Sequence, residues 1–172
     1  MMIDAPLILT LTLDENAQQY FDQLRTAHFP PARNYLRAHV TLFHHLPGAD
    51  YAAVTARLRT VAAGTPQLML RVTGVRFLGQ GVAYTLENAA LQHLHRELQA
   101  TWAPVLRPQD LQPLRPHVTV QNKVTPATAR ALHEELTASF EPHTVTGTGL
   151  ALWAYRNGPW DLLDRFAFEQ EK

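Results

Sequence analysis

Two histidines in this chain stand in nearly the same seven-residue context. Residues 36–42 read Leu-Arg-Ala-His-Val-Thr-Leu, and residues 114–120 read Leu-Arg-Pro-His-Val-Thr-Val. A threonine follows each histidine by two positions, which gives two pairs: His39 with Thr41, and His117 with Thr119. An imidazole takes or gives a proton near neutral pH, and a hydroxyl can hold an anionic oxygen. We therefore expect an enzyme that moves protons around a phosphodiester.

The spacing within each pair suits a β-strand. Successive side chains of a strand point to opposite faces, so His39 and Thr41 share one face, while Val40 and Leu42 point into the core. Two residues of strand span about 6.6 to 6.8 Å, which lets an imidazole and a hydroxyl contact different oxygens of one phosphate. Two pairs that face each other across a cleft form a four-point clamp. One neutral imidazole takes a proton from water, the other donates a proton to the departing sugar oxygen, and no metal is required.

The same alternation extends the cleft face to the neighbours of each pair. It places Arg37 and Arg115 before the histidines, and Phe43 and Gln121 after the threonines. The arginines are candidates for bidentate phosphate binding, with simple solvation as the alternative. Phe43 and Gln121 are candidates for substrate binding. For Phe43, stacking on a base and packing in the core are the two open readings.

Three aromatic residues near the end of the chain are further candidates for base stacking. Trp153, Tyr155 and Trp160 lie on a predicted hairpin, where packing within the hairpin is the alternative. We do not interpret His44 and His45 as a metal site, because adjacent strand residues face opposite sides and no carboxylate cluster accompanies them. We expect no metal and no cofactor.

Composition and charge restrict the function classes. The chain has 172 residues, of which 46% are hydrophobic and 17% charged, as is typical of a globular protein. It has no cysteine, which excludes disulfides, thiolate nucleophiles and cysteine-bound metals. Lys and Arg together number 15, and so do Asp and Glu. Proteins that track long nucleic acids usually carry an excess of positive charge, so we expect the partner to be a small nucleotide or an RNA end.

No segment of the sequence indicates export or membrane insertion. The N-terminus has no basic region before an apolar helix, and no stretch approaches the run of about 18 apolar residues that a membrane span needs. We therefore expect a cytoplasmic monomer without a membrane partner.

Local patterns place the two motifs in a repeated order of elements. The first half contains a strand at 6–13, a helix from Asp14 or Asn16 to about 27, the motif strand, a helix at 51–63 and a strand at 67–77. The second half contains a strand at 82–86, a helix at 88–102, the motif strand, a helix at 126–140 with Thr125 as its N-cap, and a hairpin of 149–155 and 160–168. Units of about 80 residues are too small for separate cores. We expect one α+β domain, 1–172, with approximate repeats at 6–80 and 82–168 that share a core.

The paired His-x-Thr-apolar strands, their spacing and the duplicated α+β arrangement resemble the two-histidine (2H) phosphoesterase superfamily. That superfamily includes bacterial 2'-5' RNA ligase-like proteins and 2',3'-cyclic nucleotide phosphodiesterases. The likeness covers nearly the whole chain in the order of its elements, and the two short motifs are its specific part. It implies two lobes related by a pseudo-two-fold axis, mainly antiparallel sheets, helices packed outside and a central cleft. It also implies that His39 and His117 are catalytic and that Thr41 and Thr119 bind phosphate.

These observations predict a metal-independent phosphodiesterase that opens nucleoside or RNA-terminal 2',3'-cyclic phosphates and leaves a 2'-phosphate. An RNA 2'-5' ligase, which runs the same chemistry in reverse, is one alternative. A nucleotide-binding module that keeps the clamp without turnover is another. The two motif copies are nearly equivalent, so the sequence leaves open which histidine is the base and which the acid.

Overall fold

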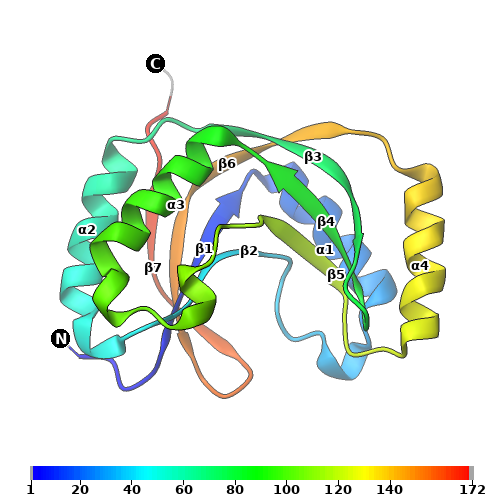
Figure 1. Ribbon diagram of the computed structural model, residues 1–172, viewed down its shortest axis with the longest axis horizontal. Helices are drawn as coiled ribbons and strands as arrows, with labels where there is room; N and C mark the ends of the chain where they lie inside the picture. The colour runs from blue at the N-terminus through cyan, green and yellow to red at the C-terminus, as the bar shows by residue number, and fades with distance from the viewer. Residues whose placement is uncertain (1, 171–172) are drawn as a thin grey trace.

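A computed structural model describes residues 2–170 of the chain. The helices (Figure 1) are α1 Glu15–His28, α2 Tyr51–Ala63, α3 Ala89–Trp102 and α4 Pro126–Ser139. The strands are β1 Leu7–Leu13, β2 Val40–Leu46, β3 Leu68–Phe77, β4 Val82–Glu87, β5 His117–Gln121, β6 His143–Tyr155 and β7 Trp160–Ala167. Four short 3-10 helices lie at Pro31–Arg33, Gly48–Asp50, Ala103–Val105 and Pro108–Leu111. No helix among residues 2–170 is long and apolar enough to cross a membrane.

The seven strands form one antiparallel sheet, which confirms the expected α+β class. Its order is β2-β1-β6-β3-β4-β5, and β7 also pairs with β6. The long strand β6 joins two lobes, because 147–154 pairs with β1 whereas 143–147 pairs with β3. The first lobe therefore consists of β2, β1, the second half of β6, and β7. The second lobe consists of β5, β4, β3 and the first half of β6.

Each lobe is covered on its outer face by two helices, one of which comes from the other half of the chain (Figure 1). Helix α2 packs on β7 and β6, and α4 packs on β3 and β4. Helix α1 follows β1 of the first lobe but packs on β5 of the second. Helix α3 follows β4 of the second lobe but reaches β2 of the first, where the Nε2 of His95 donates to the carbonyl of Leu42 at 3.0 Å. One core cluster accordingly contains residues of both halves.

Helices α1 and α4 begin where a capping side chain satisfies one of the first free backbone N–H groups. Asp14 accepts a hydrogen bond from the amide of Ala17, and Thr125 accepts one from the amide of Thr128. Pro126 occupies the first position of α4, where the missing N–H has no cost. These caps confirm the expected starts of the first and last helices.

Strand β6 begins six residues earlier than the hairpin predicted from the sequence. Its first residues, 143–147, pair with β3, although their glycine and threonine content is typical of a turn. Gly147 pairs with Leu13 on one side and Leu68 on the other, at the point where the strand passes between the lobes. A Cβ at Gly149 would lie 2.5 Å from the carbonyl oxygen of Phe166. These glycines permit close packing at the crossing instead of ending the strand.

Candidate active site

The two motifs lie on the two edge strands of the sheet. Strands β2 and β5 stand at opposite ends of the strand order, yet residues of the two strands lie close to each other, so the sheet is strongly curved. Figure 1 shows both strands in the middle of the molecule, between the two groups of helices. The curvature brings residues that are far apart in the sequence to one place.

Both motif histidines are held by the same backbone contact. The Nδ1 of His39 lies 2.8 Å from the carbonyl oxygen of Arg37, and the Nδ1 of His117 lies 2.8 Å from that of Arg115. A carbonyl oxygen can only accept, so Nδ1 carries the proton in each ring. In both copies this leaves Nε2 as the nitrogen that can take or give a proton to a ligand.

The strand register of the first motif contains a bulge directly after the threonine. Thr41 pairs with Thr10, but the next pair is Phe43 with Leu9, so β2 has one extra residue, Leu42, at this point. A bulge reverses the alternation of side chains beyond it. Phe43 is therefore fully buried, and the expectation that it faces the cleft is wrong.

The second motif has a bulge at the equivalent position. Thr119 pairs with Ala83, but Gln121 pairs with Val82, so Val120 is the extra residue. Gln121 is buried, with 4% of its surface exposed, and it does not extend the cleft face as predicted. The bulges restrict the polar cleft face of each motif strand to the His-x-Thr pair.

The two arginines that precede the histidines differ in their contacts. The guanidinium of Arg37 forms an ion pair with Asp22 of α1, with Nη2 and Nε at 2.8 and 2.9 Å from the same carboxylate oxygen. A phosphate at Arg37 would have to compete with that carboxylate, so the geometry does not favour the predicted binding role. Arg115 is exposed, and its role in phosphate binding stays a prediction.

A buried arginine of α1 links the second motif strand to the loop that precedes the first motif. Arg25 is 4% exposed, and its Nη1 donates to the carbonyl of Thr119 at 3.0 Å. Its Nε donates to the side chain of Asn34 at 3.1 Å, and its guanidinium lies 4.1 Å from the ring centroid of Phe29. Sequence reasoning missed this residue, because a basic side chain in the last turn of a helix normally lies in solvent.

His39 lies in an environment that disfavours its charged form. Burial lowers the pKa of His39 to about 4, against the opposing effect of the Arg37 carbonyl, and the charges of Arg25 and His117 lower it further. The ring of Trp160 lies against the imidazole, with the ring centroids 4.7 Å apart. His39 is therefore neutral at pH 7, and its Nε2 has a free lone pair.

A family comparison agrees with this geometry. Residues 13–159, which include both motifs, match the family model described as the 2'-5' RNA ligase superfamily. The chain belongs to this superfamily. Its members are 2H phosphoesterases, as the resemblance of the two motifs implied. Among curated proteins, none matches the sequence of this chain at a significant level.

Solved structures show the same fold at low sequence identity. TT0787 of Thermus thermophilus has a TM-score of 0.68 and 16% identity, over 97% of this chain and 100% of its own. LigT of E. coli in complex with 3'-AMP has a TM-score of 0.64 and 18% identity, over 96% of this chain and 99% of its own. LigT in complex with NADP+ has a TM-score of 0.61 and 19% identity, over 95% and 98% of the two chains.

A cavity of about 410 Å³ opens beside His39 in this 2'-5' RNA ligase superfamily member. Trp153 and Trp160 line it, and the Nε1 of Trp153 donates to the hydroxyl of Thr10 at 2.9 Å. Two of the three aromatic candidates thus lie beside the motif. The third, Tyr155, is 39% exposed and does not line this cavity.

A buried carboxylate anchors the end of the first motif strand. Asp110, whose side chain is 1% exposed, accepts hydrogen bonds from the backbone amides of His44 and His45 at 2.8 and 2.9 Å. It also bonds the Nδ1 of His44 at 3.1 Å. Burial raises the pKa of Asp110, but these hydrogen bonds outweigh it and hold the pKa below the ordinary value. The loop that leads to His117 is thereby attached to β2.

Across residues 2–170, no three His, Cys, Asp or Glu side chains come together in a group that could hold a metal ion. His44 and His45, adjacent in the sequence, bind Asp110 through their backbone amides.

Proposed function

We propose that this protein is a metal-independent phosphodiesterase that opens 2',3'-cyclic phosphates on a nucleoside or at an RNA end. One observation carries the proposal: His39 and His117 are oriented by the same Nδ1–carbonyl contact, on strands that come into contact, with both Nε2 atoms left free. Paired imidazoles of this kind are suited to general acid–base catalysis.

The different surroundings of the two histidines support a division of roles. His39 is neutral at pH 7, so we assign it as the base that takes a proton from the attacking water. The water oxygen forms a bond to phosphorus, and the bond from phosphorus to the 3' oxygen breaks. His117 donates the proton that this leaving oxygen needs. The product carries a 2'-phosphate and a 3'-hydroxyl.

The threonines and the adjacent cavity account for binding. Hydroxyl donors at Thr41 and Thr119 suit the non-bridging phosphate oxygens, where negative charge grows in the transition state. The cavity of about 410 Å³, with Trp153 and Trp160 in its wall, suits one nucleoside whose base stacks on an indole. LigT, which shares the fold, was crystallised with 3'-AMP, NADP+ and ATP.

The test is turnover of a panel of nucleoside 2',3'-cyclic phosphates and an oligonucleotide that ends in a cyclic phosphate, with EDTA present. Phosphorus NMR of the products identifies a 2'-phosphate. His117→Ala should lose about 10²- to 10⁴-fold in rate, and the matched control, His93→Ala on α3, should lose nothing. Absence of turnover of every substrate, or an absolute requirement for added metal, contradicts the proposal.

An RNA 2'-5' ligase is the second candidate, favoured by the description of the matched superfamily. The same clamp would then join a cyclic phosphate end to a 5'-hydroxyl. The formal charge of the chain is zero, which does not favour extensive contact with RNA backbones. Adding a 5'-hydroxyl oligonucleotide to the same assay separates the two activities, because only ligation lengthens the RNA. Binding of nucleotide without either reaction would indicate a binding module.

A further inference from the structure

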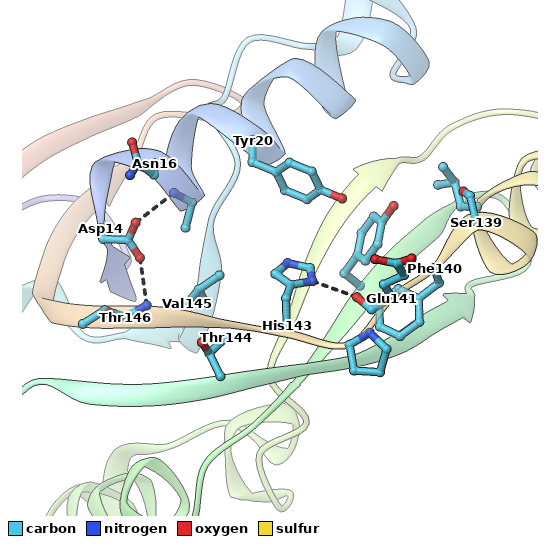
Figure 2. Close-up of a pocket in the computed structure, with 14 residues that line it drawn as sticks. Asp14, Asn16, Tyr20, Ser139, Phe140, Glu141, His143, Thr144, Val145 and Thr146 are labelled. Carbon is cyan, nitrogen blue, oxygen red and sulfur yellow. Dashed lines mark hydrogen bonds between the residues drawn. The ribbon is translucent and has the colours of Figure 1, made fainter.

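A second cavity lies on the helix-covered face of the second lobe. Its volume is about 630 Å³, and it is lined by the start of α1, the end of α4, the start of β6 and one residue of β4, Tyr84 (Figure 2). Tyr84 pairs with Val118, which lies between His117 and Thr119 and therefore points to the opposite face of the sheet from these two side chains. This cavity is thus separated from the two motifs by the thickness of the sheet.

Four aromatic side chains in the cavity wall form a closed ring of neighbours, the aromatic cage. Its members are Tyr20, Tyr84, Phe140 and His143. The centroid distances around the cage are 5.6 Å from His143 to Tyr20, 6.5 Å from Tyr20 to Tyr84, 6.2 Å from Tyr84 to Phe140 and 6.5 Å from Phe140 to His143. Every neighbouring pair is inclined, at angles from 44° to 77°. Figure 2 shows the rings of Tyr20, Phe140 and His143 on different sides of the cavity.

These distances suit a shared cation. A cation contacts an aromatic face when it lies within about 6 Å of the ring centroid. Two rings at right angles that each lie about 4.5 Å from one cation have centroids about 6.4 Å apart. The separations around the aromatic cage lie near this value. Inclined rings of this kind are the usual receptor for quaternary ammonium groups.

The charged side chains in the cavity wall are negative, which suits a cation. Asp14 and Glu141 line the cavity, and none of its lining residues within 2–170 is Lys or Arg. Asp14 is held in place, since its two oxygens accept from the amides of Ala17 and Thr146 at 2.9 and 2.8 Å. Ser139 and Phe140 belong to the C-terminal end of α4, where the helix dipole is negative. These three features attract a cation, while the positive N-terminal end of α1, which also lines the cavity, is capped by the Asp14 carboxylate.

Two walls of the aromatic cage are fixed in position. The Nδ1 of His143 donates to the carbonyl of Glu141 at 3.0 Å, as Figure 2 shows, which orients the imidazole ring. Tyr84 is 3% exposed, and its backbone is fixed because β4 pairs with β3 on one side and with β5 on the other. A receptor that is already ordered binds its ligand at a lower entropic cost.

We propose that the aromatic cage binds a small organic ammonium ion, such as one with a trimethylammonium head group. The ammonium would lie against the rings of Tyr20, Phe140 and His143, with the buried Tyr84 at the floor of the cavity, and with Glu141 and Asp14 as its counter-charges. The proposal does not depend on the phosphodiesterase activity, because the cavity shares no residue with the two motifs.

The experiment is calorimetric titration of the whole protein with choline and with 3,3-dimethylbutan-1-ol, an uncharged molecule of nearly the same shape. We expect saturable binding of choline and at least about tenfold weaker binding of the alcohol, because only the cation gains from the ring faces and the carboxylates. Equal affinity for the two ligands, or no saturable binding of choline, overturns the proposal.

Variants place the binding in the aromatic cage. Phe140→Leu keeps an apolar side chain but removes a ring face, and should weaken choline binding about tenfold. Glu141→Gln, on an exposed residue, tests the charge with little risk to folding. The matched control is Phe77→Leu, since Phe77 is an exposed aromatic residue outside the cavity. Wild-type affinity in both Phe140→Leu and Glu141→Gln contradicts the proposal.

The last titration uses a peptide that carries trimethyl-lysine, to test whether the cavity also binds an ammonium group on a protein. If choline competes with it at the same site, the shared ammonium chemistry is confirmed. If the peptide binds and choline does not, the cavity recognises a protein tail, and the small-molecule proposal is wrong.

Discussion

Two histidines with matching sequence contexts differ in what surrounds them. Each donates from Nδ1 to the carbonyl two residues before it, so the local geometry is the same. Only His39 has the ring of Trp160 against it. Burial and the nearby charge of Arg25 then favour the neutral form of His39. This difference in surroundings arises from contacts made by α1 and the β6–β7 hairpin, and it is the asymmetry that the proposed base and acid require.

The pH dependence of catalysis follows from this environment. His39 must be neutral to act as a base, and its pKa is lowered to about 4. We therefore expect kcat/KM to fall on the acidic side with a midpoint near pH 4, well below the ordinary histidine value of 6.5. A pH–rate profile measured in buffers of constant ionic strength checks this. An acidic limb centred at about 6.5 would falsify the assignment of His39 as the base.

The lowered pKa of His39 should also make the free energy of unfolding depend on pH. A histidine whose pKa is lower in the folded state binds more protons when unfolded, so its contribution is complete above about pH 6.5 and is lost as the pH falls towards about 4. Urea unfolding of the wild type and of His39→Asn across this range supplies the comparison. The pH dependence should be shallower in the variant.

The threonine hydroxyls and the indole of Trp160 should contribute to different kinetic constants. Thr41→Val and Thr119→Val keep the side-chain shape and remove the hydroxyl, so we expect kcat to fall about 10- to 10³-fold if these groups stabilise the transition state. Trp160→Leu should chiefly raise KM, because a stacked base contributes binding that changes little during the reaction. Steady-state kinetics with one cyclic nucleotide measures both effects.

Replacement by serine is the control for the threonines. Thr41→Ser and Thr119→Ser restore the hydroxyl and should recover most of kcat. If the valine variants keep the wild-type kcat while His117→Ala is inactive, the threonines are strand-forming residues and the four-point clamp is wrong.

At the scale of elements, the motif strands depend on supports from outside the sheet. Each lies at an edge, where one side of the backbone has no neighbouring strand. Asp110 binds two amides at the end of β2, and Gln92 of α3 donates to the carbonyl of Leu114 before β5 at 2.9 Å. Gln18 of α1 donates in the same way to the carbonyl of Ala38 at 2.8 Å. These contacts hold both motif strands in position.

Removing the Asp110 carboxylate should therefore be costly. Asp110→Ala leaves the part-buried amides of His44 and His45 without this acceptor, and we expect a loss of about 2 kcal/mol in the free energy of unfolding. Urea denaturation measures it. Asp161→Ala is the matched control, because its exposed ion pair with Arg156 should contribute less than about 1 kcal/mol. Similar losses in the two variants would show that Asp110 does not support β2.

At the scale of the whole molecule, the two lobes are interleaved. Strand β6 belongs to both, and helices α1 and α3 each cover the lobe of the other half. Separating the lobes would expose the buried faces of both helices and divide a continuous strand. We therefore expect the two motif strands to belong to one cooperative structure, which would suit the proposed site of four side chains in fixed relative positions.

We expect unfolding in a single cooperative transition. The three tryptophans report on the first lobe by fluorescence, since Trp102 of α3 packs on Phe43 of β2 and the other two, Trp153 and Trp160, lie on β6 and β7. Far-ultraviolet circular dichroism reports on the helices and strands of both lobes. The two urea transitions should coincide, with equal midpoints and slopes. Separate transitions would show that the lobes are independent units that meet only at the cleft.

The sequence alone determined the features that depend on local spacing. The His-x-Thr pairs, the alternation that places them on one strand face, the order of the helices and strands, and the caps at Asp14 and Thr125 follow from residues within a few positions of one another. The α+β class and the superfamily could be predicted for this reason. Local patterns also indicated Trp160 as a candidate, and its ring lies against His39 in the folded chain.

Only the tertiary structure decided what depends on residues far apart in the chain. The bulges at Leu42 and Val120 arise from pairing with β1 and β4, and they bury Phe43 and Gln121 against the expected alternation. Arg25 reaches Thr119 across 94 residues of sequence. A local pattern records which side chains share a face, but it does not record which segment will pack on that face or which charge will come beside a histidine. Burial and neighbouring charge, which favour the neutral form of His39, exist only once the chain is folded.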